Sequence, residues 1–228
     1  MTEYIRCICR KPEFRIFLLS VVFIAALVLP VAAYTPAAVS AFNTGVNLTE
    51  NGQYEKALLS FDQAISLEPK YFEAWNGKAD VLNRLGRYNE SLMAVDTGLG
   101  INPQFTQGWI NRGAILYNLG RYDDELASYD KAIAIDPQSD VAWFNRAYSL
   151  AAMGRYDESL AAFAKVKELN PDYPYLQRNT DQAAALQKAE KSKEFSHWVN
   201  TIILPAAALI VIFAVVALWY MRLRKKKK

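Results

Sequence analysis

The chain has 228 residues, 52% of them hydrophobic, with 26 Lys and Arg against 23 Asp and Glu. The net charge of +3 describes no single surface, because residues 38–195 carry 16 basic against 21 acidic side chains and the other 10 basic residues lie in the two ends. This distribution gives no argument for nucleic-acid binding. The only cysteines are Cys7 and Cys9, which excludes a disulfide framework and a paired CxxC zinc site.

Residues 1–15 carry four basic side chains and precede an uncharged apolar run at residues 16–33. A basic flank of this kind is expected in the cytoplasm, which places the middle of the chain on the far side of a membrane. The run ends with Pro30 and small residues up to Ala33, as at a signal-peptidase site. Its 18 residues also suffice for one membrane span. The residues therefore leave open whether the run is a signal peptide cleaved after Ala33 or a retained transmembrane anchor.

Several positions in the middle of the chain recur every 34 residues. They form a proline, a glycine, a tyrosine and a tryptophan series: Pro69, Pro103, Pro137 and Pro171; Gly52, Gly86, Gly120 and Gly154; Tyr54, Tyr88, Tyr122 and Tyr156; Trp75, Trp109 and Trp143. A repeat this short cannot bury a hydrophobic face alone, so it must stack on its neighbours and form an elongated array that usually serves binding. With each proline counted as position 32, the four repeats run 38–71, 72–105, 106–139 and 140–173.

These residues resemble the tetratricopeptide repeat (TPR) family, a helix, a turn and an antiparallel helix. Repeat 1 carries the pattern in Gly45, Gly52, Tyr54, Ala57, Phe61, Ala64 and Pro69, with Ala41 in place of the early Trp. The resemblance implies an all-α helical-repeat solenoid. Small residues at Gly45, Ala79, Gly113 and Ala147 are expected to let the paired helices approach. The recurring glycines are expected to end each first helix in a left-handed conformation.

Two repeats depart from the family pattern. Repeat 2 has Val95 and Gly98 where an aromatic residue and an alanine are usual, and a glycine inside a helix costs about 1 kcal/mol relative to alanine. We therefore expect its second helix to be the softest. In repeat 3, Glu125 occupies a place that the family gives to alanine. Its carboxylate must bend outward or find a partner.

The resemblance also implies which side chains face a ligand, because the first helices of the family line an inner groove. Carried over one by one, the groove residues are Phe42, Asn76, Asp80, Asn83, Arg84, Ile110, Tyr117, Asn118, Phe144 and Tyr148. Aromatic anchors beside amide side chains suit a protein or peptide ligand. Two alternatives stay open: Ile110, Phe144 and Tyr148 contact the next repeat or the capping helix, and Asp80 with Arg84 forms an internal ion pair.

The C-terminal part begins with a capping helix expected at residues 174–195. It continues into an uncharged run at residues 199–220, which as a helix would span roughly 33 Å and predicts a transmembrane helix. The polybasic residues 221–228 are expected to stay in the cytoplasm, where they also suit anionic lipid headgroups.

No pattern for catalysis, a cofactor or a metal ion accompanies these features, and the sole histidine, His197, lies beside the apolar run. Asn47 and Asn89 match the N-glycosylation acceptor pattern. We therefore expect a non-enzymatic, membrane-anchored TPR scaffold or adaptor that binds partner proteins or peptides on the extracytoplasmic side. The alternatives are a structural or assembly subunit of a membrane complex and a tail-anchored TPR receptor that faces the cytoplasm.

Overall fold

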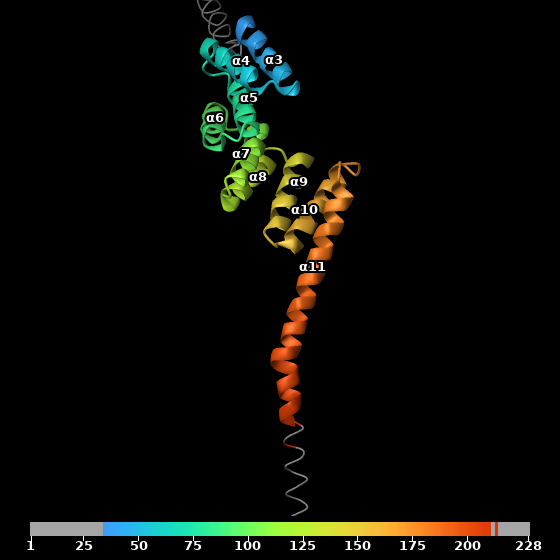
Figure 1. The fold of residues 1–228 in the computed structure, drawn as a ribbon. Coiled ribbons are helices and arrows are strands. Elements are labelled where there is room, and N and C mark those ends of the chain that lie inside the picture. Colours follow the sequence, from blue (N-terminus) through green and yellow to red (C-terminus); the bar gives the residue numbers. More distant parts are fainter. Residues whose placement is uncertain (1–33, 211–212, 214–228) are drawn as a thin grey trace, which may run out of the picture.

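The computed structural model describes residues 34–210 and 213. Within these residues the chain forms helices and no strand. Consecutive helices pair and the pairs stack into an elongated array (Figure 1): α3 (Pro36–Glu50) with α4 (Tyr54–Leu67), α5 (Phe72–Arg84) with α6 (Tyr88–Ile101), α7 (Thr106–Asn118) with α8 (Tyr122–Ile135), and α9 (Asp140–Ala152) with α10 (Tyr156–Leu169). A longer helix, α11 (Leu176–Trp198), follows the last pair. The all-α repeat array expected from the sequence is confirmed, whereas the predicted anchor or signal peptide at residues 16–33 lies outside the described residues.

The same turn joins the two helices of every repeat. Gly52, Gly86, Gly120 and Gly154 have φ angles of 70°, 74°, 71° and 78°. In the first of these turns the N–H of Gln53 donates to the carbonyl of Leu48 at 2.8 Å, which satisfies a carbonyl left free at the helix end. The predicted left-handed helix stop is confirmed. A side chain at these glycines would be strained, because L-residues rarely adopt this conformation.

Within a repeat, a small residue on the first helix faces a larger residue on the second. A Cβ atom added to Gly113 would lie 2.4 Å from Cε1 of Tyr129, and one added to Gly45 would lie 2.8 Å from Cε1 of Phe61. The glycines therefore make room for the aromatic rings and, as the sequence predicted, let the paired helices approach each other. The equivalent pairs in the other repeats are Ala79 with Val95 and Ala147 with Phe163.

The tryptophans tie each repeat to the one before it. The indole Nε1 donates to the carbonyl of the preceding repeat's proline, at 3.0 Å from Trp75 to Pro69, 2.9 Å from Trp109 to Pro103 and 3.1 Å from Trp143 to Pro137. Repeat 1 has no repeat before it and hence no proline carbonyl to bind. This explains why the buried Ala41 can replace tryptophan there.

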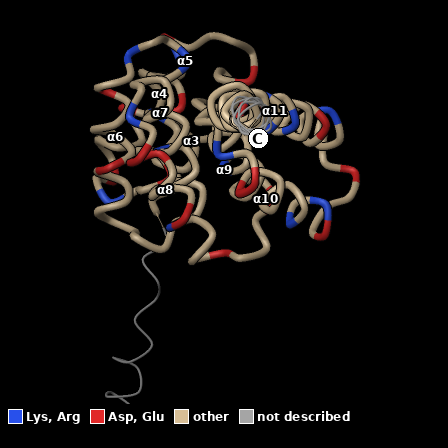
Figure 2. The backbone as a smooth tube through the Cα atoms, turned by 90° about the horizontal axis from the view of Figure 1, so that it is seen from below, with Lys and Arg blue, Asp and Glu red and all other residues tan. Residues whose placement is uncertain are grey.

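Ion pairs cross the same three junctions. They join Asp62 to Lys78 at 2.7 Å, Asp96 to Arg112 at 2.8 Å and Asp130 to Arg146 at 2.7 Å. Each pair is partly exposed, so each contributes on the order of 1 kcal/mol or less. Seen along α11, acidic and basic positions are scattered over the array and do not gather into one basic face (Figure 2).

The second helix of repeat 2 packs against the backbone of the first at Gly98. Gly98 is buried, and a Cβ atom there would lie 3.1 Å from the carbonyl oxygen of Phe72 and 3.2 Å from Cβ of Trp75. The glycine therefore serves packing, in addition to lowering helix propensity. Nothing lies within 4 Å of a Cβ atom added to Gly100. That this helix is the softest stays a prediction.

The first repeat begins earlier than residue 38. The hydroxyl of Thr35 caps α3 by accepting from the N–H of Ala38 at 3.4 Å. The ring of Tyr34 stacks on Tyr71 with centroids 3.9 Å apart, and its hydroxyl donates to Oε2 of Glu73 at 3.2 Å. Burial, and next the Glu73 charge, raise the pKa of Tyr34 to about 12. Tyr34 is thus docked on the array.

Helix α11 caps the array with its first half. Leu176 and Ala183 are buried against Ala147 and Phe163, as a capping helix requires. Farther along α11, Lys191 forms an ion pair with Asp157 of repeat 4 at 3.4 Å. Beyond it α11 stands away from the array (Figure 1).

A π-helical turn, η1 (Val199–Ile203), continues α11, and the N–H of Leu204 donates to the carbonyl of Val199. Pro205, which has no N–H to donate, follows directly. Residues 204–210 and 213 are again helical. None of the helices in the described part of the chain combines the length and the apolarity needed to cross a membrane. The other positions of the predicted span at 199–220, and the tail at 221–228, lie outside the described residues.

Candidate binding groove

The first helices of the repeats line three hollows that follow one another along the array. The first lies among α3, α5 and α7 and has a volume of about 500 Å³. The second lies among α7, α8 and α9 and has about 220 Å³. The third lies between α9 and α11 and has about 470 Å³. We call the row of three hollows the groove.

The first hollow combines phenylalanine rings with paired polar groups. Phe42 is half-buried beside Phe61, with ring centroids 5.8 Å apart. Nε of Arg84 donates to Oδ2 of Asp80 at 2.9 Å, so the alternative left open by the sequence, an internal ion pair, is the one observed. The hydrogen bond to Asp80 raises the pKa of Arg84. The two charged side chains that line the groove are therefore already paired with each other.

Asparagines link successive first helices along the groove. Nδ2 of Asn111 donates to Oδ1 of Asn76 at 3.0 Å, and Nδ2 of Asn118 donates to Oδ1 of Asn83 at 2.8 Å. Each pair fixes the orientation of two amides across a repeat junction. A side-chain amide has two donor hydrogens and two acceptor lone pairs, so a paired asparagine can still bond a ligand.

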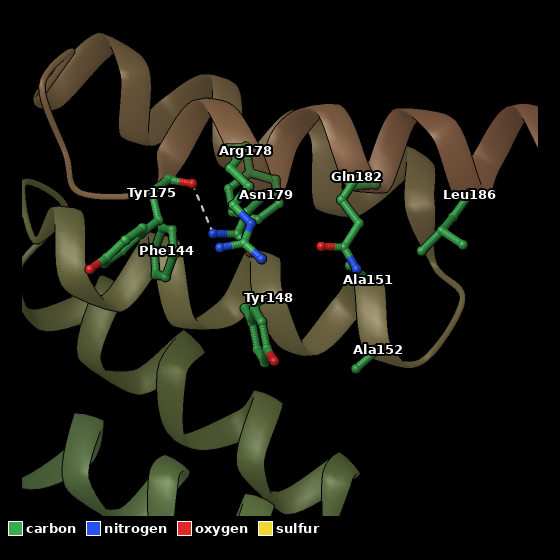
Figure 3. A pocket seen from close by; sticks show the side chains of 11 residues that line it. Phe144, Tyr148, Ala151, Ala152, Tyr175, Arg178, Asn179, Gln182 and Leu186 are labelled. Atoms are coloured by element: carbon green, nitrogen blue, oxygen red, sulfur yellow. Dashed lines mark hydrogen bonds between the residues drawn. The ribbon is translucent and has the colours of Figure 1, made fainter.

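Two aromatic residues of α9, Phe144 and Tyr148, line the third hollow together with residues of α11 (Figure 3). Phe144 is half-buried, with its ring centroid 4.6 Å from that of Tyr173 and 5.7 Å from that of Phe163. Tyr148 is 47% exposed. On α11 the hollow is lined by Arg178, Asn179, Gln182, Ala183 and Leu186, with Tyr175 just before the helix. The sequence left open whether Phe144 contacts a ligand or the capping helix. Its ring packs against Phe163 of its own repeat and Tyr173 of the turn before α11, and it also lines the hollow.

Ile110 does not belong to the groove, which corrects the set expected from the sequence. Its side chain is 5% exposed and packs with Tyr129, Ala132 and Ala142 between repeats 3 and 4. An aliphatic side chain at this position gains more from burial in the junction than from facing water. The other expected groove residues line a hollow or, like Asn83, bond to a residue that does.

The second hollow contains a buried carboxylate. Glu125 has no exposed surface, and its Oε1 accepts a hydrogen bond from the hydroxyl of Ser149 in the next repeat. Of the two outcomes expected for this residue, it therefore finds a partner. Burial raises the pKa of Glu125, and the hydrogen bond from Ser149 partly offsets the effect. Burial and the Glu125 charge in turn raise the pKa of Tyr129 well above its usual range.

The neighbouring repeats show what Glu125 replaces. At the same position the buried Ser91 donates to the carbonyl of Ala79 at 2.6 Å, and the buried Ser159 donates to the carbonyl of Ala147 at 2.7 Å. Repeat 1 has Ala57. The sequence had already marked Glu125 as a departure from the family pattern, but not its partner Ser149. The asparagines at 111 and 145, also 34 residues apart, were missed by the sequence reasoning.

The two predicted glycosylation sites lie in helices. Asn47 is exposed on α3 and Asn89 is exposed on α6, but the hydroxyl of Ser91 in the second acceptor motif is buried and bonded to the backbone. Glycosylation stays a prediction. Within residues 34–210 and 213, no group of His, Cys, Asp or Glu side chains is arranged to hold a metal ion.

Comparison with known proteins agrees with this architecture. Residues 45–86 and 113–154 match a TPR repeat model, and residues 141–173 match a tetratricopeptide repeat model. These matches identify the repeats at residues 45–86 and 113–173 as tetratricopeptide repeats. No curated protein matches it.

Several solved TPR proteins share the fold. A thermophilic TPR protein from Thermus thermophilus has a TM-score of 0.60 at 20% identity over 80% of this chain and 100% of that one. The MamA protein has a TM-score of 0.58 at 13% identity, covering 72% and 91% of the two chains. YrrB, a TPR protein with an unusual peptide-binding site, has a TM-score of 0.54 at 23% identity, covering 66% and 78%. At these identities the likeness establishes the fold alone.

Proposed function

We propose that this TPR scaffold is anchored in a membrane and binds a peptide segment of partner proteins in its groove, on the extracytoplasmic side. The observation that carries the binding function is the row of three hollows along the first helices. They present aromatic side chains at both ends of the groove and paired asparagines between them.

This layout matches the chemistry of a peptide. Apolar side chains of a ligand fit beside Phe42 at one end and beside Phe144 and Tyr148 at the other. The asparagines supply hydrogen bonds for the ligand backbone between those anchors. YrrB, whose fold this chain shares, is described as having a peptide-binding site, which supports a peptide as the ligand.

A photo-crosslinking experiment tests the groove. A benzophenone amino acid is placed at Tyr148 in the groove and, as a matched control, at Met93, which is 71% exposed on the second helix α6. The full-length protein is irradiated in its own cells. We expect covalent adducts from position 148 and not from position 93, and fewer adducts from position 148 when Phe144 is changed to Ala.

Adducts of equal amount from both positions, or from position 93 alone, would contradict the groove as the binding surface. The Phe144→Ala variant must keep its helical circular dichroism, because the Phe144 ring also contacts Phe163.

Membrane anchoring is supported by the sequence and by the exposed C-terminal helix. Residues 199–220 carry no charge and precede a basic tail. The described apolar side chains of this run are uncovered, with Leu209 57%, Ile210 69% and Phe213 73% exposed. Uncovered apolar surface of this kind marks a contact with a membrane or a partner. The continuous helix from α11 into this run would hold the array near the bilayer.

Labelling of single cysteines tests the topology. In a chain with Cys7 and Cys9 changed to Ser, one cysteine is introduced at Met93 in the array or at Lys227 in the tail, and intact cells are treated with a membrane-impermeant maleimide. We expect Met93→Cys to react before lysis and Lys227→Cys only after it. The opposite order would assign the array to the cytoplasm and support the tail-anchored alternative.

A further inference from the structure

Glu125 has a carboxylate oxygen without a partner. Its side chain is fully buried, Oε1 accepts from Ser149, and Oε2 accepts no hydrogen bond from any described residue. A buried polar group without a partner is costly, and more so when charged. Repeats 2 and 4 avoid this cost by using serine. Repeat 3 therefore carries a polar group that its own fold does not need.

The surroundings of this carboxylate favour a cation. The second hollow is lined by Tyr117 of α7 and Tyr148 of α9, which are 37% and 47% exposed and have ring centroids 6.4 Å apart. Asn118 and Asn145 add two amides, and none of the described residues that line the hollow is a lysine, arginine or histidine. Aromatic faces attract ammonium and guanidinium groups, and a carboxylate pairs with them through charge-assisted hydrogen bonds.

We propose that the second hollow is the subsite for a cationic side chain, a lysine ammonium or an arginine guanidinium, of the peptide bound in the groove. The proposal rests on the proposed function and names the chemistry of its ligand. The cationic N–H groups donate to Oε2 of Glu125, and the aliphatic stem passes between Tyr117 and Tyr148, whose exposed rings rotate to admit it. The volume of about 220 Å³ has room for one side chain.

A different arrangement accounts for the same contacts without a ligand. The hydroxyl of Ser149 also lies 3.0 Å from the carbonyl oxygen of Asn145, and one hydroxyl hydrogen cannot serve two acceptors. A protonated Glu125 that donates to Ser149 would complete this network. In that arrangement the hollow shows no preference for a cation.

Ligand-observed NMR on the purified full-length protein separates the two. The probes are N-acetyl-lysine N-methylamide and its uncharged isostere, N-acetyl-norleucine N-methylamide. We expect the lysine probe to bind at least tenfold more tightly, and Glu125→Gln to reduce its affinity to that of the norleucine probe. Glu125→Ser should reduce the affinity for the lysine probe in the same way. Serine is the residue found at the equivalent position of repeats 2 and 4, so this variant is expected to fold. The control Asp123→Asn removes an exposed acidic charge from the same helix and should leave the preference unchanged.

Equal affinity for the two probes, or an unchanged lysine preference in both Glu125 variants, would overturn the proposal. Failure of the subsite is distinct from failure of the proposed function. Groove crosslinks at position 148 without a lysine preference would leave the function in place and reject the subsite. A lysine preference without groove crosslinks would reject peptide binding and retain the cation site.

Discussion

Repeats 2 and 3 use the same backbone unit with different side chains at three internal positions. Repeat 2 pairs Ala79 with Val95, and repeat 3 pairs Gly113 with Tyr129. Where repeat 2 has Ser91 bonded within the repeat, repeat 3 has Glu125 bonded to Ser149 in the next repeat.

The two kinds of difference are accommodated in different ways. The change in volume is compensated inside the repeat, because the larger ring faces the smaller residue. The change in polarity is not, because the Glu125 carboxylate, in the first turn of α8, takes its hydrogen bond from Ser149 of the next repeat, and its other oxygen has no partner among the described residues. A change of side-chain volume is thus compensated within one repeat, whereas a buried carboxylate needs a hydrogen-bond partner from the next repeat or from the groove.

The largest expected effect comes from breaking the volume pairing in repeat 3. Gly113→Ala places a Cβ atom 2.4 Å from the Tyr129 ring, and such overpacking costs about 2–3 kcal/mol. Adding Tyr129→Val recreates the small and medium pair of repeat 2 and should recover part of the loss. Urea unfolding of the two single variants and the double variant measures the coupling. Additive losses would show that the two positions are not a compensating pair.

Removing the carboxyl charge of Glu125 should change how stability depends on pH. Burial raises the pKa of Glu125 in the folded protein, so its favourable contribution is full below the unfolded carboxyl pKa and is lost as pH rises through the folded pKa. The free energy of unfolding of Glu125→Gln, relative to that of the parent chain, should therefore rise as pH increases above about 4.5. We expect a rise of about 1–3 kcal/mol, which is the cost of leaving a buried polar group unpaired. Thermal unfolding of both proteins between pH 4 and pH 8 tests this. A constant difference would show that Glu125 does not titrate in this range.

The hydrogen bonds that join the repeats should have an intermediate effect. Trp109→Phe removes the indole donor to Pro103 and leaves that carbonyl unpaired, which should cost about 1 kcal/mol beyond the lost ring area. Trp198→Phe, which changes an exposed tryptophan at the C-terminal end of α11, serves as the control. Chemical denaturation should show a loss for the first variant only. Equal midpoints would mean that the indole contributes by packing alone.

The smallest effects distinguish two glycines of the same helix. Gly98→Ala forces a Cβ atom against Phe72 and Trp75, so the closer packing should outweigh the helix gain and cost about 1 kcal/mol. Gly100→Ala meets no atom within 4 Å and should stabilise by about 0.5–1 kcal/mol. The two midpoints are measured under the same conditions. Stabilisation by both changes would show that α6 can move away from α5.

Much of the groove could be assigned from the sequence because the repeat fixes which helix positions face it. Phe42, Asn76, Tyr117 and Tyr148 line the hollows where the family pattern placed them. Ile110 was wrongly assigned to the groove because its repeat position does not show whether an aliphatic side chain turns toward the contact between repeats 3 and 4. Asn145 and Ser149 were missed because their role depends on Glu125 of the preceding repeat.

The sequence by itself determined the period, the four helix pairs, the glycine turns and the small residues where the paired helices approach each other. These features depend on local backbone preferences and on contacts between helices joined by a short turn. Only the tertiary structure decided which partner each polar side chain takes across a junction, including the indoles on the proline carbonyls, the asparagine pairs and Glu125 with Ser149. Those contacts join residues 6 to 35 positions apart, and their geometry follows from how one repeat stacks on the next.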